Sequence, residues 1–401
     1  MSDDESSVDS VSSEEVEKEE EEITDLSNSD VCTKYQEAAR IANLAITGLV
    51  SQIKPGATAL SLCTFGEAVI TSQVAKLYNK KVDGKSIEKG VAFPVSISVN
   101  ECVCNNSPLS SEEQLGLNAG DIIKIDLGCH IDGYISVAAH TVIVPPSTDA
   151  PVEIPASAED IGDVAVAAYN AMLVASAAIK AGAKNSDVTA AVEKVAAAYG
   201  VNPIAHVRMH QMKRFVIDGV KEVALRTPAP EDEEEKLAEC TFETNEVYAV
   251  DVAMSSGDGK VKEADQRVTI YKRNVESNYR LKMKASRYVL NEVNAKFPTL
   301  PFTLRMFDDE RQAKMGITEC VNHGLVVPYP SLVEKSGSTV AHFKCTVLVL
   351  PSGPSRVTGL GIPEYFKSEK SPDDDTAKIL EEIRIKAEKK AAKKKKKKNK
   401  K

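Results

Sequence analysis

The stretch GDIIKIDL at residues 120–127 has a counterpart in NEVYAVDV at residues 245–252, an offset of 125 residues. Each contains a largely apolar run of the kind that forms buried strands, and an aspartate, Asp126 or Asp251, lies at the same place in each run. A carboxylate inside an apolar strand costs free energy unless it is paired with a cation or binds a metal. Two aspartates at equivalent places therefore predict a site at which two halves of the chain face each other.

A second pair of stretches supports this internal repeat. IKPGA at 53–57 aligns with IKAGA at 179–183, an offset of 126 residues that nearly equals the first one. A structural unit that is used twice at a near-constant offset predicts two halves related by pseudo-twofold symmetry.

Hydrophobic periodicity predicts which elements the halves contain. Apolar residues at helical spacing predict a pair of helices in each half, over 35–53 and about 59–79, then over 160–180 and 187–199. Ser186 or Asp187 is the expected N-cap of the last helix. Strand patterns follow each helix pair, at 95–99, 122–127, 141–144, 247–253 and 346–350. The sequence therefore predicts a fold that contains both helices and sheet.

Composition excludes several other classes of protein. The chain has 401 residues, of which 42% are hydrophobic and 27% charged, so it can bury a sizeable core. The apolar stretch at 164–179 has only 16 residues, fewer than the roughly 20 that span a bilayer, and is expected to be a buried helix. The first ten residues lack the features of a signal peptide. Eight scattered cysteines without a CxxC pair indicate reduced thiols.

The two ends carry opposite charges. Residues 1–30 contain thirteen acidic residues against Lys18 alone, and residues 384–401 contain twelve basic residues against Glu388. Because both segments repel themselves and contain little apolar material, we expect them to be disordered. The lysine run is expected to bind nucleic acid in a manner that depends on salt but not on base sequence.

Several motifs in the middle of the chain resemble a known family. They are DLGxHxDG at 126–133, VIDG at 216–219, YAVDV at 248–252, DQRVTIYKR at 265–273 and the proline-containing stretches TLPF at 299–302 and VPYP at 327–330. With the lysine-rich end, these motifs resemble the proliferation-associated proteins, also called ErbB-receptor-binding or curved-DNA-binding proteins. That family is a non-peptidase branch of the type 2 methionine aminopeptidases.

The resemblance implies an α+β pita-bread fold, in which two pseudo-twofold-related halves each combine helices with antiparallel sheet, together with a helical insertion like that of the type 2 enzymes. The expected segments are an acidic, disordered head at 1–30, a pita-bread domain at 31–366 and a disordered tail at 367–401. Within the domain, the halves are expected at about 31–145 and 158–350, and the insertion at about 277–328.

The resemblance also assigns five positions to metal ligands. The peptidases hold two divalent metals with two Asp, one His and two Glu, and these positions in this chain are Asp126, Val137, His210, Asp251 and Lys344. Only two carboxylates remain of four, and one position has become an ammonium group. We expect Lys344 to bridge Asp126 and Asp251 in place of the metals. The resulting prediction is a pseudoenzyme that has no metal and no other cofactor.

Two further positions, at which the peptidases use histidines near the substrate, read Asn105 and Asp218. Both changes favour the same prediction, because neither side chain can act as a histidine does.

Basic residues on the expected folded body and in the C-terminal tail are candidates for binding nucleic acid. They form three groups: Lys80, Lys81 and Lys85; Lys272, Arg273, Arg280, Lys282, Lys284 and Arg287; and the tail residues Lys393, Lys394, Lys395, Lys396, Lys397 and Lys398. Basic side chains interleaved with tyrosines can combine phosphate contacts with base stacking. An ordinary solvated helix face is the alternative interpretation of the middle group.

The resemblance implies association with ribosomes and ribosomal RNA. We therefore expect an inactive, monomeric scaffold that binds structured RNA on the large ribosomal subunit or its precursors and influences ribosome biogenesis, translation and growth. The implied location is the cytoplasm and the nucleus, including the nucleolus, and no membrane is involved. Two alternatives stay open. One is a regulator of transcription that binds DNA or regulatory proteins, and the other is a residual one-metal peptidase that uses Asp126, His210 and Asp251.

Overall fold

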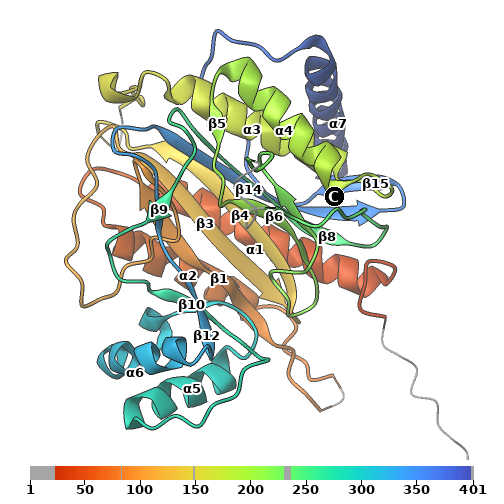
Figure 1. Cartoon of the computed structure of the whole chain (residues 1–401). Coiled ribbons are helices and arrows are strands. Elements are labelled where there is room, and N and C mark those ends of the chain that lie inside the picture. Colours follow the sequence, from red (N-terminus) through yellow and green to blue (C-terminus); the bar gives the residue numbers. More distant parts are fainter. Residues whose placement is uncertain (1–22, 83, 148–149, 230–235, 399–401) are drawn as a thin grey trace, which may run out of the picture.

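A single antiparallel sheet lies at the centre of the molecule (Figure 1). The computed structural model describes residues 23–82, 84–147, 150–229 and 236–398. The sheet has nine strands, seven of which follow one another in the order β1 (Lys89–Val99), β3 (Ile122–Ile131), β4 (Tyr134–Ile143), β14 (Val340–Leu350), β8 (Val247–Ser255), β6 (Arg208–Met212) and β7 (Glu222–Ala224). Two short strands are attached to this path, β15 (Gly353–Arg356) beside β14 and β5 (Asn202–Pro203) beside β8.

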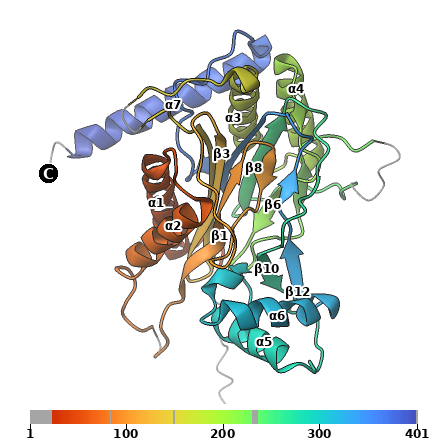
Figure 2. The same cartoon turned by 90° about the vertical axis from the view of Figure 1, so that its left-hand side faces the viewer.

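Two helix pairs pack on the sheet (Figure 2). They are α1 (Ser29–Gln52) with α2 (Ala59–Val74), and α3 (Ile161–Ala178) with α4 (Asn185–Tyr199). The first pair packs on β1, β3 and β4, whereas α3 packs on β8 and β14. Each pair forms its own apolar core with its half of the sheet. All four predicted helices are therefore present, on the strands of their own half.

The helix boundaries differ from the predicted ones for local reasons. α1 begins six residues early because the Asn28 side chain caps it and accepts a hydrogen bond from the Asp30 N–H at 2.9 Å. α4 begins at Asn185. Its Asp187 carboxylate accepts from the backbone N–H of Lys184 at 3.1 Å, so neither Ser186 nor Asp187 is the N-cap.

The internal repeat is visible in matching turns. Gly56 and Gly182 both have positive φ, of 81° and 86°, a conformation that glycine adopts without strain. Their N–H groups donate to Leu117 and Phe242, respectively. At the next position of each turn, the carbonyls of Ala57 and Ala183 accept from the N–H groups of those same partners. Equivalent backbone contacts at equivalent places support the pseudo-twofold relation between the halves.

The halves meet between β4 and β14, where threonine side chains replace most of the backbone ladder. Backbone pairing occurs at Ala139 and Lys344. On one side of that pair, the Thr141 hydroxyl bonds to both the N–H and the carbonyl of His342, at 2.8 and 2.7 Å. On the other side, the Thr346 hydroxyl bonds to both the N–H and the carbonyl of Val137, at 2.8 and 3.0 Å. Thr141 and Thr346 thus occupy equivalent places in the two halves.

Residues between about 270 and 329 form the helical insertion at the lower end of Figure 1. Its elements are β10 (Ile270–Arg273), α5 (Lys284–Lys296), β11 (Phe302–Thr303), the 3-10 helix η3 (Leu304–Met306), α6 (Glu310–Asn322) and β12 (Val326–Tyr329). The insertion has its own small apolar core. The half-buried Arg305 connects it to the body through Glu67 at 2.6 Å and the carbonyl of Pro108 at 2.7 Å.

Three short strands form a further small sheet, in the order β2 (Cys102–Cys104), β13 (Leu332–Val333) and β9 (Lys262–Glu263). A 3-10 helix, η1 (Ala156–Ala158), precedes α3.

The prediction of a disordered C-terminal segment is wrong for most of its length. Residues Asp374–Lys398 form α7, whose base lies against α3 and whose far end projects from the body (Figure 2). Asp373 caps the helix, because its carboxylate accepts from the N–H and the hydroxyl of Thr376. The acidic first turn and the lysine-rich end also match the helix dipole, which favours anions at the N-terminus and cations at the C-terminus.

At the other end of the chain, residues 1–22 lie outside the described residues. The remainder of the predicted head is ordered, because Leu26 is buried in a core cluster and α1 begins at Ser29. The predicted head was therefore too long, because its C-terminal limit was set by acidic composition alone.

Helix α3 satisfies the length and composition of a membrane span. Eleven of its residues are buried, however, most of them in the core formed with β8, β14 and α4. Packing thus accounts for its apolar composition, as the sequence predicted. All eight cysteines lie in the described segments and are free.

The threonine contacts between the halves lead to the first testable prediction. Replacing Thr346 with Val keeps the shape of the side chain but leaves the buried N–H of Val137 without its partner. We expect the free energy of unfolding to fall by about 1–3 kcal/mol, and Thr141→Val to have a similar effect. Urea denaturation of the purified variants measures both changes. Thr318→Val, on the exposed face of α6, is the control that should change little.

Candidate functional site

Asp126 and Asp251 lie in one row across the central sheet. Asp126 on β3 pairs with Ala139 on β4, Ala139 pairs with Lys344 on β14, and Lys344 pairs with Asp251 on β8. The row crosses the junction between the halves and faces away from the helices. The two aspartates that the repeat placed at equivalent positions are thus brought to the same place, as the sequence predicted.

Lys344 occupies the centre of this row. Its ammonium nitrogen lies 2.6 Å from Asp126 Oδ2 and 2.8 Å from Asp251 Oδ2. It reaches Asp126, two strands away, because the intervening Ala139 has too small a side chain to block it. The ring of Phe93 lies beside the ammonium, with its centroid 5.5 Å away. The predicted bridge between the two carboxylates is therefore present.

The ion pairs outweigh burial in setting the charges of the cluster. Burial acts to lower the pKa of Lys344, but the two carboxylates outweigh it and raise that pKa above its ordinary value. Burial acts to raise the pKa of Asp251, but the Lys344 ammonium and the hydrogen-bonded His342 hold that pKa well below its usual range. Lys344 is therefore an ammonium at neutral pH, and Asp251 is a carboxylate.

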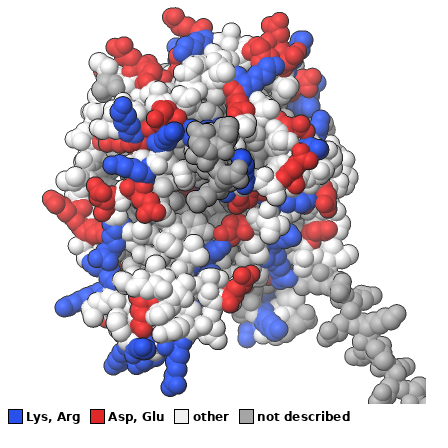
Figure 3. Space-filling model, in the orientation of Figure 1, with Lys and Arg blue, Asp and Glu red and all other residues white. Residues whose placement is uncertain are grey.

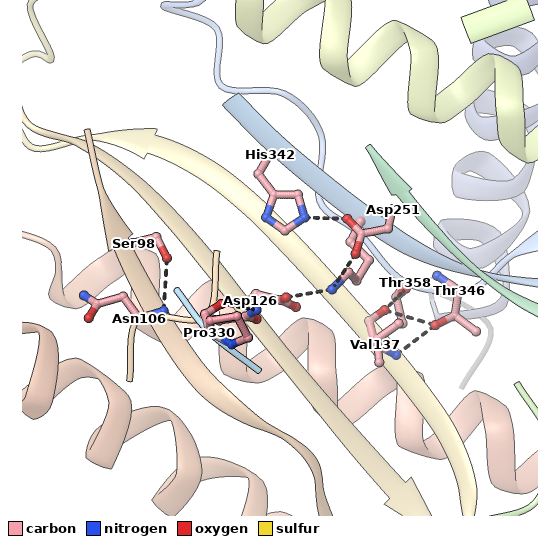
Figure 4. Close-up of polar contacts among 11 residues, drawn as sticks. Ser98, Asn106, Asp126, Val137, Asp251, Pro330, His342, Thr346 and Thr358 are labelled. Carbon is pink, nitrogen blue, oxygen red and sulfur yellow. Dashed lines mark hydrogen bonds and ion pairs between the residues drawn. The ribbon is translucent and has the colours of Figure 1, made fainter. Parts of the chain in front are cut away.

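His342 belongs to this cluster, although the sequence analysis did not assign it there. Its Nε2 lies 2.5 Å from Asp251 Oδ1 (Figure 4). One signal was available: His342 and Lys344 are two residues apart on a strand, so their side chains lie on the same face. Val137 and His342 also occupy equivalent places, each bonded through its backbone to one of the two threonines, so the halves carry different side chains next to the row.

The other two predicted ligand positions lie near the row but do not join it. Val137 is buried in an apolar cluster, and its backbone is held by the hydroxyls of Thr346 and Thr358 (Figure 4). His210 on β6 pairs with Ala249. Burial and the charge of Lys344 lower the pKa of His210, and its Nδ1 is buried without a hydrogen-bond partner among the described residues.

The residues at the site do not fit a pair of divalent metals. Two dications need several anionic oxygens, whereas this site offers two carboxylates with one oxygen of each bound to Lys344. Val137 has no donor atom, and Lys344 carries a positive charge where a metal would lie. Within the described part of the chain, no three His, Cys, Asp or Glu side chains converge as metal ligands would.

Asn105 and Asp218, which the sequence predicted at the positions of substrate-side histidines, both have contacts within the chain. The Asn105 amide donates to the carbonyl of Pro330 at 3.0 Å. Asp218 pairs with Lys272 and accepts from the hydroxyl of Tyr329 at 3.3 Å. These contacts tie the insertion and its flanking strands to the body.

The candidate nucleic-acid residues differ in their surroundings. Lys80, Lys81 and Lys85 are exposed in the segment after α2. Lys272 is paired with Asp218, and the guanidinium of Arg273 donates to several backbone carbonyls, including that of Leu325 at 2.8 Å. These last two side chains are therefore engaged within the chain, contrary to the expectation that they lie free on the surface.

The rest of that group lies at the start of α5. Its four members are exposed, and none forms an ion pair with a carboxylate of the described residues: Arg280, Lys282, Lys284 and Arg287. Of the interleaved tyrosines, Tyr271 is buried and cannot stack on a base. Tyr279 is already stacked on His323, with the two ring centroids 3.6 Å apart. The predicted lysines at 393–398 lie in the last turns of α7.

Comparison with known proteins assigns the chain to a family. A model described as metallopeptidase family M24 matches residues 33–269, more than half of the chain. The chain belongs to metallopeptidase family M24. It therefore has the pita-bread fold that the sequence predicted, with the helix pairs and the shared sheet described above.

Named relatives define the branch more closely. ErbB-3 binding protein 1 from Solanum tuberosum is 46% identical over 375 residues, which cover 93% of this chain and 92% of the relative. The curved DNA-binding protein of Schizosaccharomyces pombe is 37% identical, over 91% of this chain and 93% of its own. The solved structure of a thermophilic Arx1 superimposes with a TM-score of 0.78 at 28% identity, covering 88% of this chain and 98% of that one. The M24 member thus belongs to the branch of proliferation-associated proteins that its motifs indicated.

Removing the central cation tests the energetics of the cluster. Lys344→Met leaves Asp126 and Asp251 facing each other in a buried site without a counter-ion. We expect a loss of about 3–5 kcal/mol in the free energy of unfolding at pH 7, because an unpaired buried charge costs far more than a lost surface pair. Denaturant titration followed by circular dichroism measures the loss.

Two further variants separate the charge effect from a packing effect. Adding Asp126→Asn and Asp251→Asn to Lys344→Met removes the unpaired charges and should restore most of the stability. Lys54→Met, at an exposed position, should leave stability unchanged. A single Lys344→Met variant as stable as the wild type would contradict the role given to the ion pairs.

Proposed function

We propose that this M24 member is a catalytically inactive scaffold that binds structured RNA on ribosomes or their precursors. The observation that carries the first half of the proposal is the Lys344 ammonium within 2.8 Å of both central carboxylates. A two-metal peptidase activates water between its metals and uses carboxylates to neutralise them. In this chain one ammonium satisfies the same carboxylates and would repel an incoming dication.

The exposed basic residues of the insertion support the second half of the proposal. Arg280, Lys282, Lys284 and Arg287 lie within eight residues and have no carboxylate partner among the described residues. In Figure 3, Lys and Arg side chains gather at the lower left, over α5 and α6. Cations that no neighbour neutralises can bind phosphates and release counterions. Because the chain has a net charge of −9, this attraction acts locally.

The resemblance stated above connects these cations with ribosomal RNA and the large subunit. In the proposal the folded body provides recognition, and the lysines at 393–398 add affinity that weakens as salt is raised. A cytoplasmic, nuclear and nucleolar distribution, a monomeric state and an influence on ribosome biogenesis and growth belong to the same proposal.

Binding to duplex DNA is a second candidate, because a relative that is 37% identical is named a curved DNA-binding protein. The exposed cations described above would serve a DNA backbone as well as an RNA backbone. Competition between ribosomal RNA and duplex DNA for the protein, at about 150 mM salt, distinguishes the two.

The proposed lack of catalysis predicts no peptidase activity. We expect no release of methionine from short Met-initiated peptides, with or without added cobalt or manganese, and no tightly held divalent metal in the purified protein. Turnover assays and elemental analysis measure these two properties. About two equivalents of bound metal, or metal-dependent turnover that Asp251→Asn abolishes, would contradict the proposal.

A matched variant shows that the metal assay can detect a site in this fold. Val137→Asp together with Lys344→Glu returns carboxylates to both altered positions. We expect this double variant to gain divalent metal in equilibrium dialysis, whereas the wild type gains none under the same conditions.

Ribosome binding predicts co-sedimentation with purified large subunits at about 150 mM salt. We expect the full chain and a chain that ends at Glu382 both to sediment with the subunits. Charge reversal of Arg280, Lys282, Lys284 and Arg287 to Glu should weaken binding at least about tenfold, because each lost phosphate contact reduces counterion release.

The control reverses four exposed basic residues outside the insertion, Lys54, Lys76, Lys180 and Lys213. Equal losses in both quadruple variants would show that net charge, not the insertion, determines binding. If the full chain sediments with the subunits and the chain that ends at Glu382 does not, binding depends mainly on the charge of the lysine tail. Absence of sedimentation would reject the ribosome proposal and favour DNA or protein partners.

A further inference from the structure

A pocket lies at the small sheet, apart from the row of charged residues at the centre. It has a volume of about 610 Å³ and is formed where three segments meet. These segments are the turn at Glu101, the stretch 258–265 that contains β9, and the stretch 333–336 that follows β13. In Figure 1, β9 is labelled at the left of the molecule, well away from α5 and α6.

Glu334 gives this pocket an unusual chemical feature. The residue is only 2% exposed. Its Oε1 accepts a hydrogen bond from the N–H of Lys335 at 3.0 Å, whereas its Oε2 is buried and has no partner among the described residues. A buried carboxylate oxygen without a donor costs free energy that a bound cation or donor would recover.

The backbone around Glu334 holds the carboxylate in this position. Its own N–H donates to the carbonyl of Glu101 at 3.0 Å. Gly257 packs against it so closely that a Cβ there would lie 3.2 Å from Glu334 Oε1 and 2.6 Å from the hydroxyl of Ser338. The carboxylate is therefore closely packed among its neighbours at the pocket lining.

The remaining lining residues are suited to an organic cation with an apolar stem. Glu101, Asp258 and Asp265 add three carboxylates, and the walls include the apolar side chains of Val261, Ala264 and Val333. Lys260, Lys262 and Lys335 are exposed, and none forms an ion pair with these acids. The lining thus carries four carboxylates against three lysines, and no lysine is held in an ion pair with these acids.

A guanidinium group matches this arrangement better than a metal ion. A metal needs ligands that converge on one point, and no such convergence of acidic side chains occurs in the described segments. A guanidinium is planar, offers five N–H donors and tolerates partial burial, and its aliphatic stem packs on apolar walls. It can reach carboxylates that are spread around a pocket.

We propose that this pocket is a docking site for the side chain of an arginine carried by a partner protein, with Glu334 Oε2 as the buried acceptor. The proposal is independent of the proposed RNA binding, because the pocket and the exposed cations of the insertion are formed by different residues. It gives the scaffold a second type of partner, a protein that presents an arginine side chain.

The test uses the full chain and a fluorescent nonapeptide that contains three arginines separated by glycines. We expect saturable binding by fluorescence anisotropy at about 150 mM salt, weaker binding of the lysine version and none of the citrulline version. Glu334→Gln keeps the shape and the acceptor for Lys335 but removes the charge. It should weaken binding of the arginine peptide at least tenfold.

Glu263→Gln is the matched control, because Glu263 is exposed on β9 and loses the same charge outside the pocket lining. It should bind the arginine peptide as the wild type does, which also controls for attraction by the acidic head. If Glu334→Gln does not fold, Glu101→Gln with Asp265→Asn tests the same pocket from its rim. Equal binding by the wild type and the pocket variants, or by the arginine and citrulline peptides, would overturn the proposal.

Discussion

The buried ammonium of Lys344 and its two carboxylates are the interaction on which the centre of the structure depends. Either aspartate alone would be an uncompensated charge on an apolar sheet, and so would the lysine. Together they form contacts of 2.6 and 2.8 Å that connect β3, β14 and β8 across the junction of the halves. One ammonium group thus holds two buried carboxylates together at the centre of the fold.

Pseudo-twofold symmetry explains why the two aspartates meet. A local departure from that symmetry explains why a lysine lies between them. The matching turns at Gly56 and Gly182 and the matching threonines Thr141 and Thr346 show that the halves follow one plan. At the junction the two halves carry different side chains, since Ala139 is equivalent to Lys344, and Val137 to His342. The small residues of the first half leave the space into which the charged residues of the second half extend.

Much of this could be predicted from the sequence. The repeat and the aspartate-containing strands indicated the halves, and the family motifs indicated both the fold and the Lys344 bridge. His342 was missed because its role depends on the pairing of β14 with β8, which a single strand pattern does not reveal. Lys272 and Arg273 were wrongly expected to be free at the surface. Their partners Asp218 and Leu325 are remote in sequence, so the sequence did not reveal these contacts. Helix α7 was missed because the net charge of the tail hides the order of its charges. Acidic residues precede the lysines, which is the order that a helix dipole favours.

The length of α7 determines how far its lysine-rich end extends along the helix axis. Its 25 residues correspond to about 37 Å at a rise of 1.5 Å per residue. Figures 1 and 2 place α7 at the end of the body opposite to α5 and α6. The lysine-rich end of α7 and the exposed cations of the insertion therefore lie at opposite ends of the molecule. In the proposed function, a short RNA hairpin would contact one of these groups at a time, whereas a particle of ribosomal size would contact both.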